Sequence, residues 1–211
     1  FDFQAAVIPH QDMNKAVIAA DFMHYASYGD SSAHVLVRFD SPPSQNTKDE
    51  LKAHGVEIQK SLGGSSYIAS LKHRTLDPRG VMMVSNIKEV RQFDPTWKLH
   101  AYLADGFIPN WTMPTSGMHV DDPIIAVYVM LHSDIDLQET AREYERFYGA
   151  FVRSTIEAID TIVMEIPYST IDLLIEEDRV LYLEPALPKF TESNNSNRAV
   201  TQADTAQDAP Y

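Results

Sequence analysis

Three short stretches of the sequence hold residue types that could bind a phosphate or a metal ion. Residues 61–67, SLGGSSY, resemble a phosphate-binding loop but lack the lysine and the following helix that such a loop needs. Residues 133–139, SDIDLQE, space their acids as some calcium loops do, without the turn glycine or the distant bidentate glutamate. Residues 119–123, HVDDP, place one histidine beside two carboxylates. A hairpin turn, a helix N-terminus and a polar connector explain these stretches better than a nucleotide or metal site.

The sequence offers no set of residues that combines a nucleophile, a base and a group to orient the base. The motifs GxSxG, GxxxxGK[ST], HExxH and GxGxxG are all absent from it. Its eight histidines are scattered, and the acidic cluster Glu176, Glu177 and Asp178 is typical of a solvated helix end. We therefore expect no catalytic residues, no metal and no cofactor, and we do not expect this chain to be an enzyme itself.

Composition narrows the range of partners. The 211 residues are 44% hydrophobic, enough for one large domain or two small ones. Lys and Arg number 17 against 30 Asp and Glu, and the net charge of −13 would repel a nucleic acid backbone. The chain has no cysteine, which excludes disulfides and thiolate metal sites. No apolar run approaches the roughly 18 to 20 residues of a membrane span.

The pattern of residues 33–100 predicts the first of two similar folding units. Val35, Val37 and Phe39 alternate along a mostly buried strand. Thr47 and Glu50 have capping-box spacing, and Gly55 can end the helix that follows in a left-handed conformation. The predicted elements are a strand at 34–40, a helix at 47–55, a hairpin over 56–71, a helix-like stretch at 76–87 and a strand at 88–94.

Residues 124–190 repeat the same order of elements. Asp136 and Glu139 repeat the capping-box spacing, and Gly149 closes the helix. The predicted elements are a strand at 124–132, a helix at 136–149, strands at 151–159 and 161–167, a helix at 168–178 and a strand at 179–185. The sequence therefore predicts an α+β fold of two tandem ferredoxin-like (βαββαβ) units, each an antiparallel sheet with two helices on one face.

Three further segments flank these units. Residues 1–32 are expected to be a packed N-terminal extension with a short helix around Lys15 to His24. Residues 101–123 carry three prolines and two glycines and are expected to be a connector. Residues 191–211 have few large apolar side chains and are expected to form an extended, exposed tail.

Several phrases of the chain resemble the N-terminal prodomain of secreted bacterial subtilisin-like serine proteases (subtilases). They are the strand-rich segment from VLVRFD to IKEVRQFDP (35–95), the closing strand DRVLYLEPALP (178–188) and the polar run NRAVTQADTAQDAPY (197–211). The resemblance covers residues 33–211. It implies secretion or a place in the cell envelope, and the non-methionine Phe1 fits either a removed signal peptide or a trimmed chain.

The resemblance implies a propeptide that acts as an intramolecular chaperone and inhibitor of its cognate catalytic domain. Such a domain docks its sheet on surface helices of the protease and, after autoprocessing of the zymogen, leaves its tail in the active-site cleft. Glu184 matches the acidic residue that family prodomains direct at helix N-termini of the protease. Asp208, Ala209, Pro210 and Tyr211 match the positions before the cleavage site, with Tyr211 at the cut.

The tail has physical features that suit this role. Pro210 restricts itself and Ala209 to extended conformations, and Tyr211 offers a large flat side chain to an apolar pocket. An extended peptide of this kind can add a strand to an exposed sheet edge. The opposing interpretation is that Tyr211 is merely where the chain stops.

Three departures from the family pattern leave alternatives open. Ala186 stands where the family has a second acid, the distance from Glu184 to Tyr211 is long, and the doubled unit does not indicate which copy docks. A tandem ferredoxin-like module that senses a small ligand would instead have a pocket between the copies. A freestanding secreted protease inhibitor is a third possibility.

Overall fold

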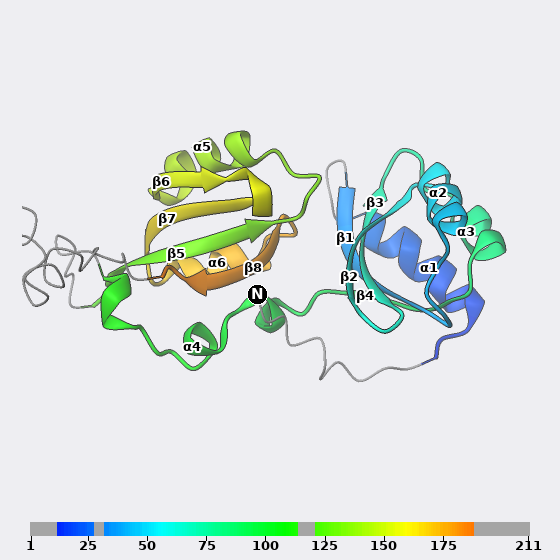
Figure 1. Cartoon of the computed structure of the whole chain (residues 1–211), viewed down its shortest axis with the longest axis horizontal. Coiled ribbons are helices and arrows are strands. Elements are labelled where there is room, and N and C mark those ends of the chain that lie inside the picture. The colour runs from blue at the N-terminus through cyan, green and yellow to red at the C-terminus, as the bar shows by residue number, and fades with distance from the viewer. Residues whose placement is uncertain (1–11, 28–31, 114–120, 188–211) are drawn as a thin grey trace, which may run out of the picture.

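The computed structural model describes residues 12–27, 32–113 and 121–187, which form two α+β units joined by a connector (Figure 1). Each unit contains a four-stranded antiparallel sheet with helices on one face, and the strand orders are β2-β3-β1-β4 and β6-β7-β5-β8. In both sheets the first and last strands of the unit are neighbours, which is the ferredoxin-like arrangement. The predicted fold class is confirmed for the two units, while residues 191–211 lie outside the described residues.

The first unit has one helix more than its ferredoxin-like core requires. Its elements are α1 (Lys15–Ala26), β1 (Ser32–Phe39), α2 (Gln45–Ala53), β2 (Val56–Gly63), β3 (Ser66–Lys72), α3 (Pro78–Val84) and β4 (Ile87–Gln92). Helix α1 buries Ile18, Phe22 and Ala26 in the same core as Val35 and Val37 of β1. Residues 12–27 of the N-terminal extension are therefore part of the first unit, and the short helix expected there is confirmed.

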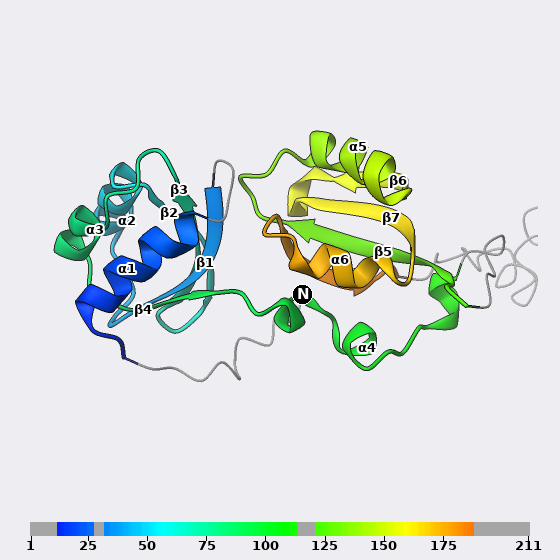
Figure 2. The ribbon, with the colours of Figure 1, turned by 180° about the vertical axis from the view of Figure 1, so that it is seen from behind.

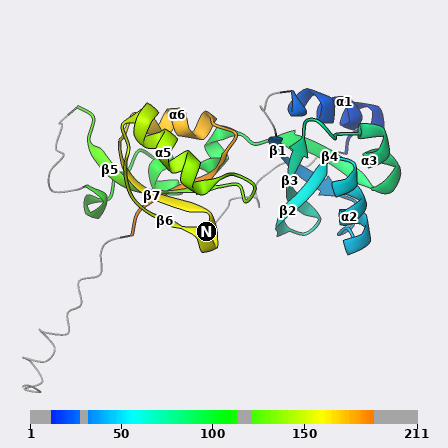
Figure 3. The ribbon, with the colours of Figure 1, turned by 90° about the horizontal axis from the view of Figure 1, so that it is seen from above.

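The second unit follows the predicted order of elements. These are β5 (Ile124–Leu131), α5 (Leu137–Tyr148), β6 (Phe151–Ile156), the short 3-10 helix η4 (Glu157–Ile159), β7 (Thr161–Pro167), α6 (Thr170–Glu176) and β8 (Val180–Pro185). Helices α5 and α6 lie on one face of the sheet (Figure 3), over a core that includes Val127, Val129 and Tyr144.

The helix ends test the capping predictions. Gly55 and Gly149 follow α2 and α5 with φ angles of 82° and 63°, so both glycines have the predicted left-handed conformation. Asp136 caps α5 by accepting a hydrogen bond from the Glu139 N–H at 2.8 Å. The predicted cap of α2 is wrong, because Ser44 rather than Thr47 precedes the helix and accepts a hydrogen bond from the Thr47 N–H at 3.1 Å.

The segment between the units packs on the second unit. Its described residues contain two 3-10 helices and one short α-helix: η2 (Pro95–Lys98), α4 (Ala101–Ala104) and η3 (Asn110–Thr112). Leu99 forms a parallel bridge with Leu183 of β8, and the His100 N–H donates to the Leu183 carbonyl at 2.9 Å. Leu103 belongs to the second core. The connector therefore covers one edge of the second sheet.

The first sheet turns its helix-free face toward the second unit, and α1, α2 and α3 lie on the far side (Figures 1 and 2). A third apolar cluster joins the units at this junction, and its buried members are Ile68, Phe93, Met130, Leu181 and Tyr182. Met130 lies near the end of β5, and Leu181 and Tyr182 lie near the start of β8. The end of β5 and the start of β8 in the second sheet therefore pack against the helix-free face of the first sheet.

Candidate docking face and the junction between the units

The second sheet has a face that no helix of the described residues covers. Because side chains alternate along a strand, the neighbours of the core residues Val127, Val129 and Met164 point to this face. They include Tyr128, which pairs with Glu184 of β8 and with Val163 of β7. These three side chains are partly exposed. We call the surface formed by Ala126, Tyr128, Phe151, Val163, Glu165 and Glu184 the open face.

Glu184 differs from the other acid on the open face. The Glu165 carboxylate accepts hydrogen bonds from the Arg153 guanidinium, so its charge is balanced. The Glu184 carboxylate makes no hydrogen bond or ion pair with any residue that the structure describes. Its charge therefore remains available to a positive group brought to this face. The open face is consequently apolar at Tyr128 and Val163, with one unbalanced negative charge beside them.

A groove of about 500 Å³ runs between the two units next to the open face. Its apolar lining includes Ile68 from the first unit and Met130 and Leu181 from the second. Lys60 and Glu184 also line it, on opposite units. The groove could therefore hold a small molecule with an apolar part and charges of both signs.

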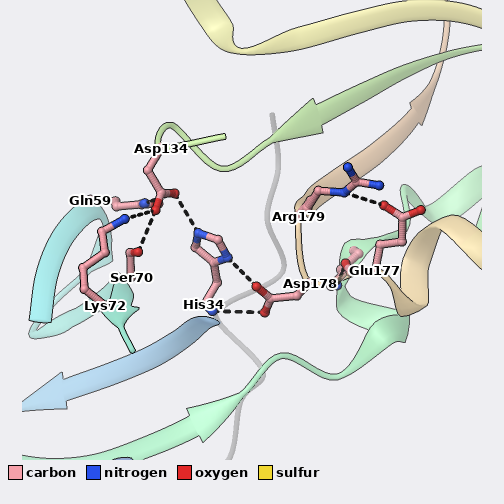
Figure 4. A network of polar contacts seen from close by, with 9 residues as sticks. His34, Gln59, Ser70, Lys72, Asp134, Glu177, Asp178 and Arg179 are labelled. Atoms are coloured by element: carbon pink, nitrogen blue, oxygen red, sulfur yellow. Dashed lines mark hydrogen bonds and ion pairs between the residues drawn. The ribbon is translucent and has the colours of Figure 1, made fainter. Parts of the chain in front are cut away.

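A network of polar contacts joins the units beside the apolar cluster (Figure 4). At its centre, His34 of β1 contacts two carboxylates of the second unit. The His34 Nε2 atom lies 2.7 Å from Asp134 Oδ1, and Nδ1 lies 2.7 Å from Asp178 Oδ2. The His34 backbone N–H also donates to Asp178 Oδ1 at 3.0 Å. His34 is buried, at 2% exposure, and so cannot exchange these contacts for water.

Besides His34 of β1, Asp134 contacts donors from two more strands of the first sheet (Figure 4). Ser70 Oγ donates to it at 2.7 Å and Lys72 Nζ at 2.5 Å, both from β3, and Gln59 Nε2 donates at 2.6 Å from β2. Burial alone would raise the pKa of Asp134, but the hydrogen bonds from His34, Lys72 and Ser70 hold it well below its usual range. Asp134 was expected to belong to the N-terminus of a helix, but it is instead a contact between the units.

His132 lies against His34 and has the opposite character. The two rings stack with centroids 3.8 Å apart and an interplanar angle of 6°. His132 is 1% exposed, and neither of its ring nitrogens has a hydrogen-bond partner among the described residues. Burial, followed by the charges of His34 and Lys98, lowers the pKa of His132 well below its ordinary value. An uncharged imidazole therefore stacks on the ring that bridges the units.

The acidic cluster at the end of α6 is not the solvated helix end that its composition predicts. Glu177 accepts hydrogen bonds from the Tyr144 hydroxyl at 3.1 Å and from Arg179 Nε at 3.0 Å. Its backbone carbonyl accepts from the buried Lys98 ammonium at 2.7 Å, and Asp178 binds His34. Only Glu176 is exposed.

Two other stretches that the sequence analysis considered, residues 61–67 and 119–123, form a hairpin turn and part of the connector where the structure describes them. Gly63, the last residue of β2, and Gly64, in the turn of the β2–β3 hairpin, both have positive φ angles. Asp122 accepts hydrogen bonds from the Ser169 N–H and hydroxyl, while His119 lies outside the described residues. Within residues 12–27, 32–113 and 121–187, no group of His, Asp and Glu could hold a metal ion, and no helix is long and apolar enough to cross a membrane.

The predicted site residues fall into two groups. Glu184 lies on the open face, at the edge of the groove. Asp208, Ala209, Pro210 and Tyr211 lie outside the described residues. The junction around His34 was not predicted, because its partners lie 100 and 144 residues away in the sequence. No local motif signals such a contact.

Comparison with known proteins gives one partial match. A family model described as a domain of unknown function (DUF8729) matches residues 2–94. This range coincides with the N-terminal extension and the first unit, which share one core. No curated protein and no solved structure matches the chain.

Proposed function

We propose that this chain is the propeptide of a subtilisin-like serine endopeptidase, which it helps to fold and then inhibits. The proposal is supported by the family resemblance of the closing strand and tail and by the ferredoxin-like form of both units. A single observation carries it: the open face of the second sheet presents Glu184 without a partner among the described residues, on the strand that leads into the tail.

The second unit is the copy that docks in this proposal. On the helix-free face of the first sheet, Ile68 and Ser70 are 1% and 0% exposed, because the second unit packs there. On the second sheet the corresponding face keeps Tyr128 and Val163 partly exposed. A partner can therefore reach the second sheet without separating the units.

The chemistry of the open face suits the N-terminal ends of helices on a partner. A helix N-terminus presents unpaired N–H groups and a partial positive charge, and it favours a nearby carboxylate by about 0.3 to 1 kcal/mol. Glu184 supplies such a carboxylate, and Tyr128 supplies apolar area beside it. Since Ala186 replaces the second acid of the family, Glu184 carries the charged part of this contact alone.

The tail completes the proposed inhibition. Asp208, Ala209, Pro210 and Tyr211 would lie in the protease cleft as the product side of the cut, and their backbone would pair with an edge of the cleft. Because Pro210 already restricts the chain to extended conformations, little conformational entropy is lost on binding. Docking by the second unit places the start of the tail on the partner's surface.

The test uses the whole chain and purified subtilisin. Deleting residues 208–211, or changing Tyr211→Asp, should raise the inhibition constant at least tenfold, because a carboxylate in an apolar pocket is costly. Ser193→Asp, a change elsewhere in the tail, is the control and should leave the constant unaltered. If the intact chain does not inhibit, or if both tail variants inhibit as well as the intact chain does, the proposed product-like inhibition is wrong.

The groove between the units favours a second candidate function, a module that senses a small ligand. Lys60 and Glu184 could bind the carboxylate and ammonium groups of an amino acid above the apolar lining of Ile68 and Met130. A thermal-shift screen against amino acids distinguishes the two functions. A sensor is stabilised by one of them and does not inhibit subtilisin, whereas a propeptide inhibits and is not stabilised.

A further inference from the structure

His34 occupies the place where the two units exchange most of their polar contacts. It lies on β1 of the first unit, and its ring reaches the loop after β5 and the loop before β8 of the second unit. The ring is completely buried, and His132 covers one of its faces. No solvent can therefore replace a lost contact without the units moving apart.

The geometry requires a charged imidazole. A carboxylate can only accept hydrogen bonds, and a neutral imidazole carries one N–H and one lone pair. Each ring nitrogen of His34 faces a carboxylate oxygen at 2.7 Å, so both nitrogens must carry a proton. Removing one proton would place a lone pair against a carboxylate in a buried site, which is strongly unfavourable.

The surroundings of His34 contain charges of both signs. The groups that face it or its carboxylate partners are Asp134, Asp178, His132, Lys72, Lys98 and Glu176. Burial alone would lower the pKa of His34, but the hydrogen bonds and charges of Asp134 and Asp178 outweigh burial and raise it. Lys72 also binds Asp134 whatever the state of His34, so part of the junction does not depend on its proton.

We propose that His34 is a pH-dependent latch, which holds the two units together when its imidazole is protonated and loosens the junction when the proton is lost. Loosening would uncover the helix-free face of the first sheet, including Ile68 and Ser70. This inference does not depend on the proposed function, because it concerns only contacts within the chain.

The direction of the pH effect follows from linkage. Because the pKa of His34 is higher in the closed junction than its unfolded value of about 6.5, the contribution of the latch is complete below that value. It is lost as the pH rises through the higher pKa of the closed form. Lys98 acts in the opposite direction, because burial lowers its pKa to about 8 and deprotonation relieves the cost of burying its charge.

The experiment measures the separation of the units directly. Since the chain has no cysteine, Ala53→Cys on α2 and Glu145→Cys on α5 provide two exposed sites for a pair of fluorophores. Energy transfer is recorded from pH 5 to pH 9. We expect the ratio of loosened to closed molecules to rise about tenfold for each pH unit by which the pKa of His34 differs between the two forms.

Three variants make the result specific to His34. His34→Gln should remove the pH response between pH 6 and 8, whereas His54→Gln, which alters a His–Asp pair inside the first unit, should keep it. Asp178→Asn should move the response to lower pH, and it tests the latch even if His34→Gln does not fold. An unchanged response in His34→Gln or in Asp178→Asn, or no response in the unaltered chain, would overturn the proposal.

Discussion

The two units have the same strand order and use the helix-free face of the sheet in opposite ways. In the first unit that face contributes Ile68, Ser70 and His34 to a junction in which Ser70 and His34 bind carboxylates of the second unit. In the second unit it presents Tyr128 and Glu184, whose carboxylate has no partner in the part of the chain that the structure describes. A repeated fold therefore does not imply a repeated role. The face whose polar and apolar groups already contact the other unit is structural, whereas the face that keeps an exposed apolar group and an unpaired charge is free to bind a partner.

The largest expected effect comes from breaking the junction with a buried charge. Ile68→Asp places a carboxylate at a site that is 1% exposed, among Phe93 and Met130. We expect a loss of about 3 kcal/mol in the free energy of unfolding, since the change removes a buried apolar side chain and places a charge among apolar neighbours, although Lys60 faces residue 68 across the β2–β3 pair. Urea unfolding should then show two separate transitions in place of one.

Met83→Asp is the matched control for this change. Met83 is 87% exposed on α3 of the same unit, so the control should alter the free energy of unfolding by less than about 0.5 kcal/mol. Equal losses for Ile68→Asp and Met83→Asp would mean that the apolar cluster does not hold the units together.

The second effect concerns the buried Lys98 ammonium. Its pKa of about 8 lies below the unfolded value of 10.5, so the unfolded state binds more protons between these values and stability rises with pH there. The rise should be about 3 kcal/mol in the unaltered chain. Lys98→Met should abolish this pH dependence in urea unfolding between pH 8 and 10.5. A rise of the same size in Lys98→Met would assign the effect to another group.

The third effect compares the two glycines that end equivalent helices. A Cβ at Gly55 would lie 2.7 Å from backbone atoms of Thr75 and Leu76, whereas a Cβ at Gly149 would meet nothing within 4 Å. Both glycines have positive φ angles, which cost an alanine roughly 1 kcal/mol. Gly149→Ala should therefore cost about 1 kcal/mol and Gly55→Ala about 3 kcal/mol, because the steric clash adds to the strain. Equal costs in chemical denaturation would mean that the backbone near Leu76 moves freely.

The fold could be predicted because its signals are local. The alternation of Val35, Val37 and Phe39 and the glycines after α2 and α5 specify strands and helix ends within a few residues of sequence. The cap of α2 was misplaced because Ser44 and Thr47 both have hydroxyl side chains that can cap a helix, and backbone geometry selects Ser44. The sequence also placed Glu184 on a final strand, where the structure has it.

The junction could not be predicted for the opposite reason. Asp134 and Asp178 each have an ordinary local explanation, as acids near a helix start and a helix end, and nothing near them in the sequence indicates a partner in another unit. Their contacts with His34 depend on how two complete folds pack. A partner of this kind is visible only once the tertiary structure is known.

The most direct test of the central claim compares charge reversals on the two units in subtilisin inhibition by the whole chain. Glu184→Lys should raise the inhibition constant about tenfold, because a favourable charge at a helix N-terminus becomes an unfavourable one. Glu57→Lys alters an acid on β2 that already pairs with Lys52 and should leave the constant unchanged. If Glu57→Lys weakens inhibition and Glu184→Lys does not, the first unit docks and the assignment of the open face is wrong.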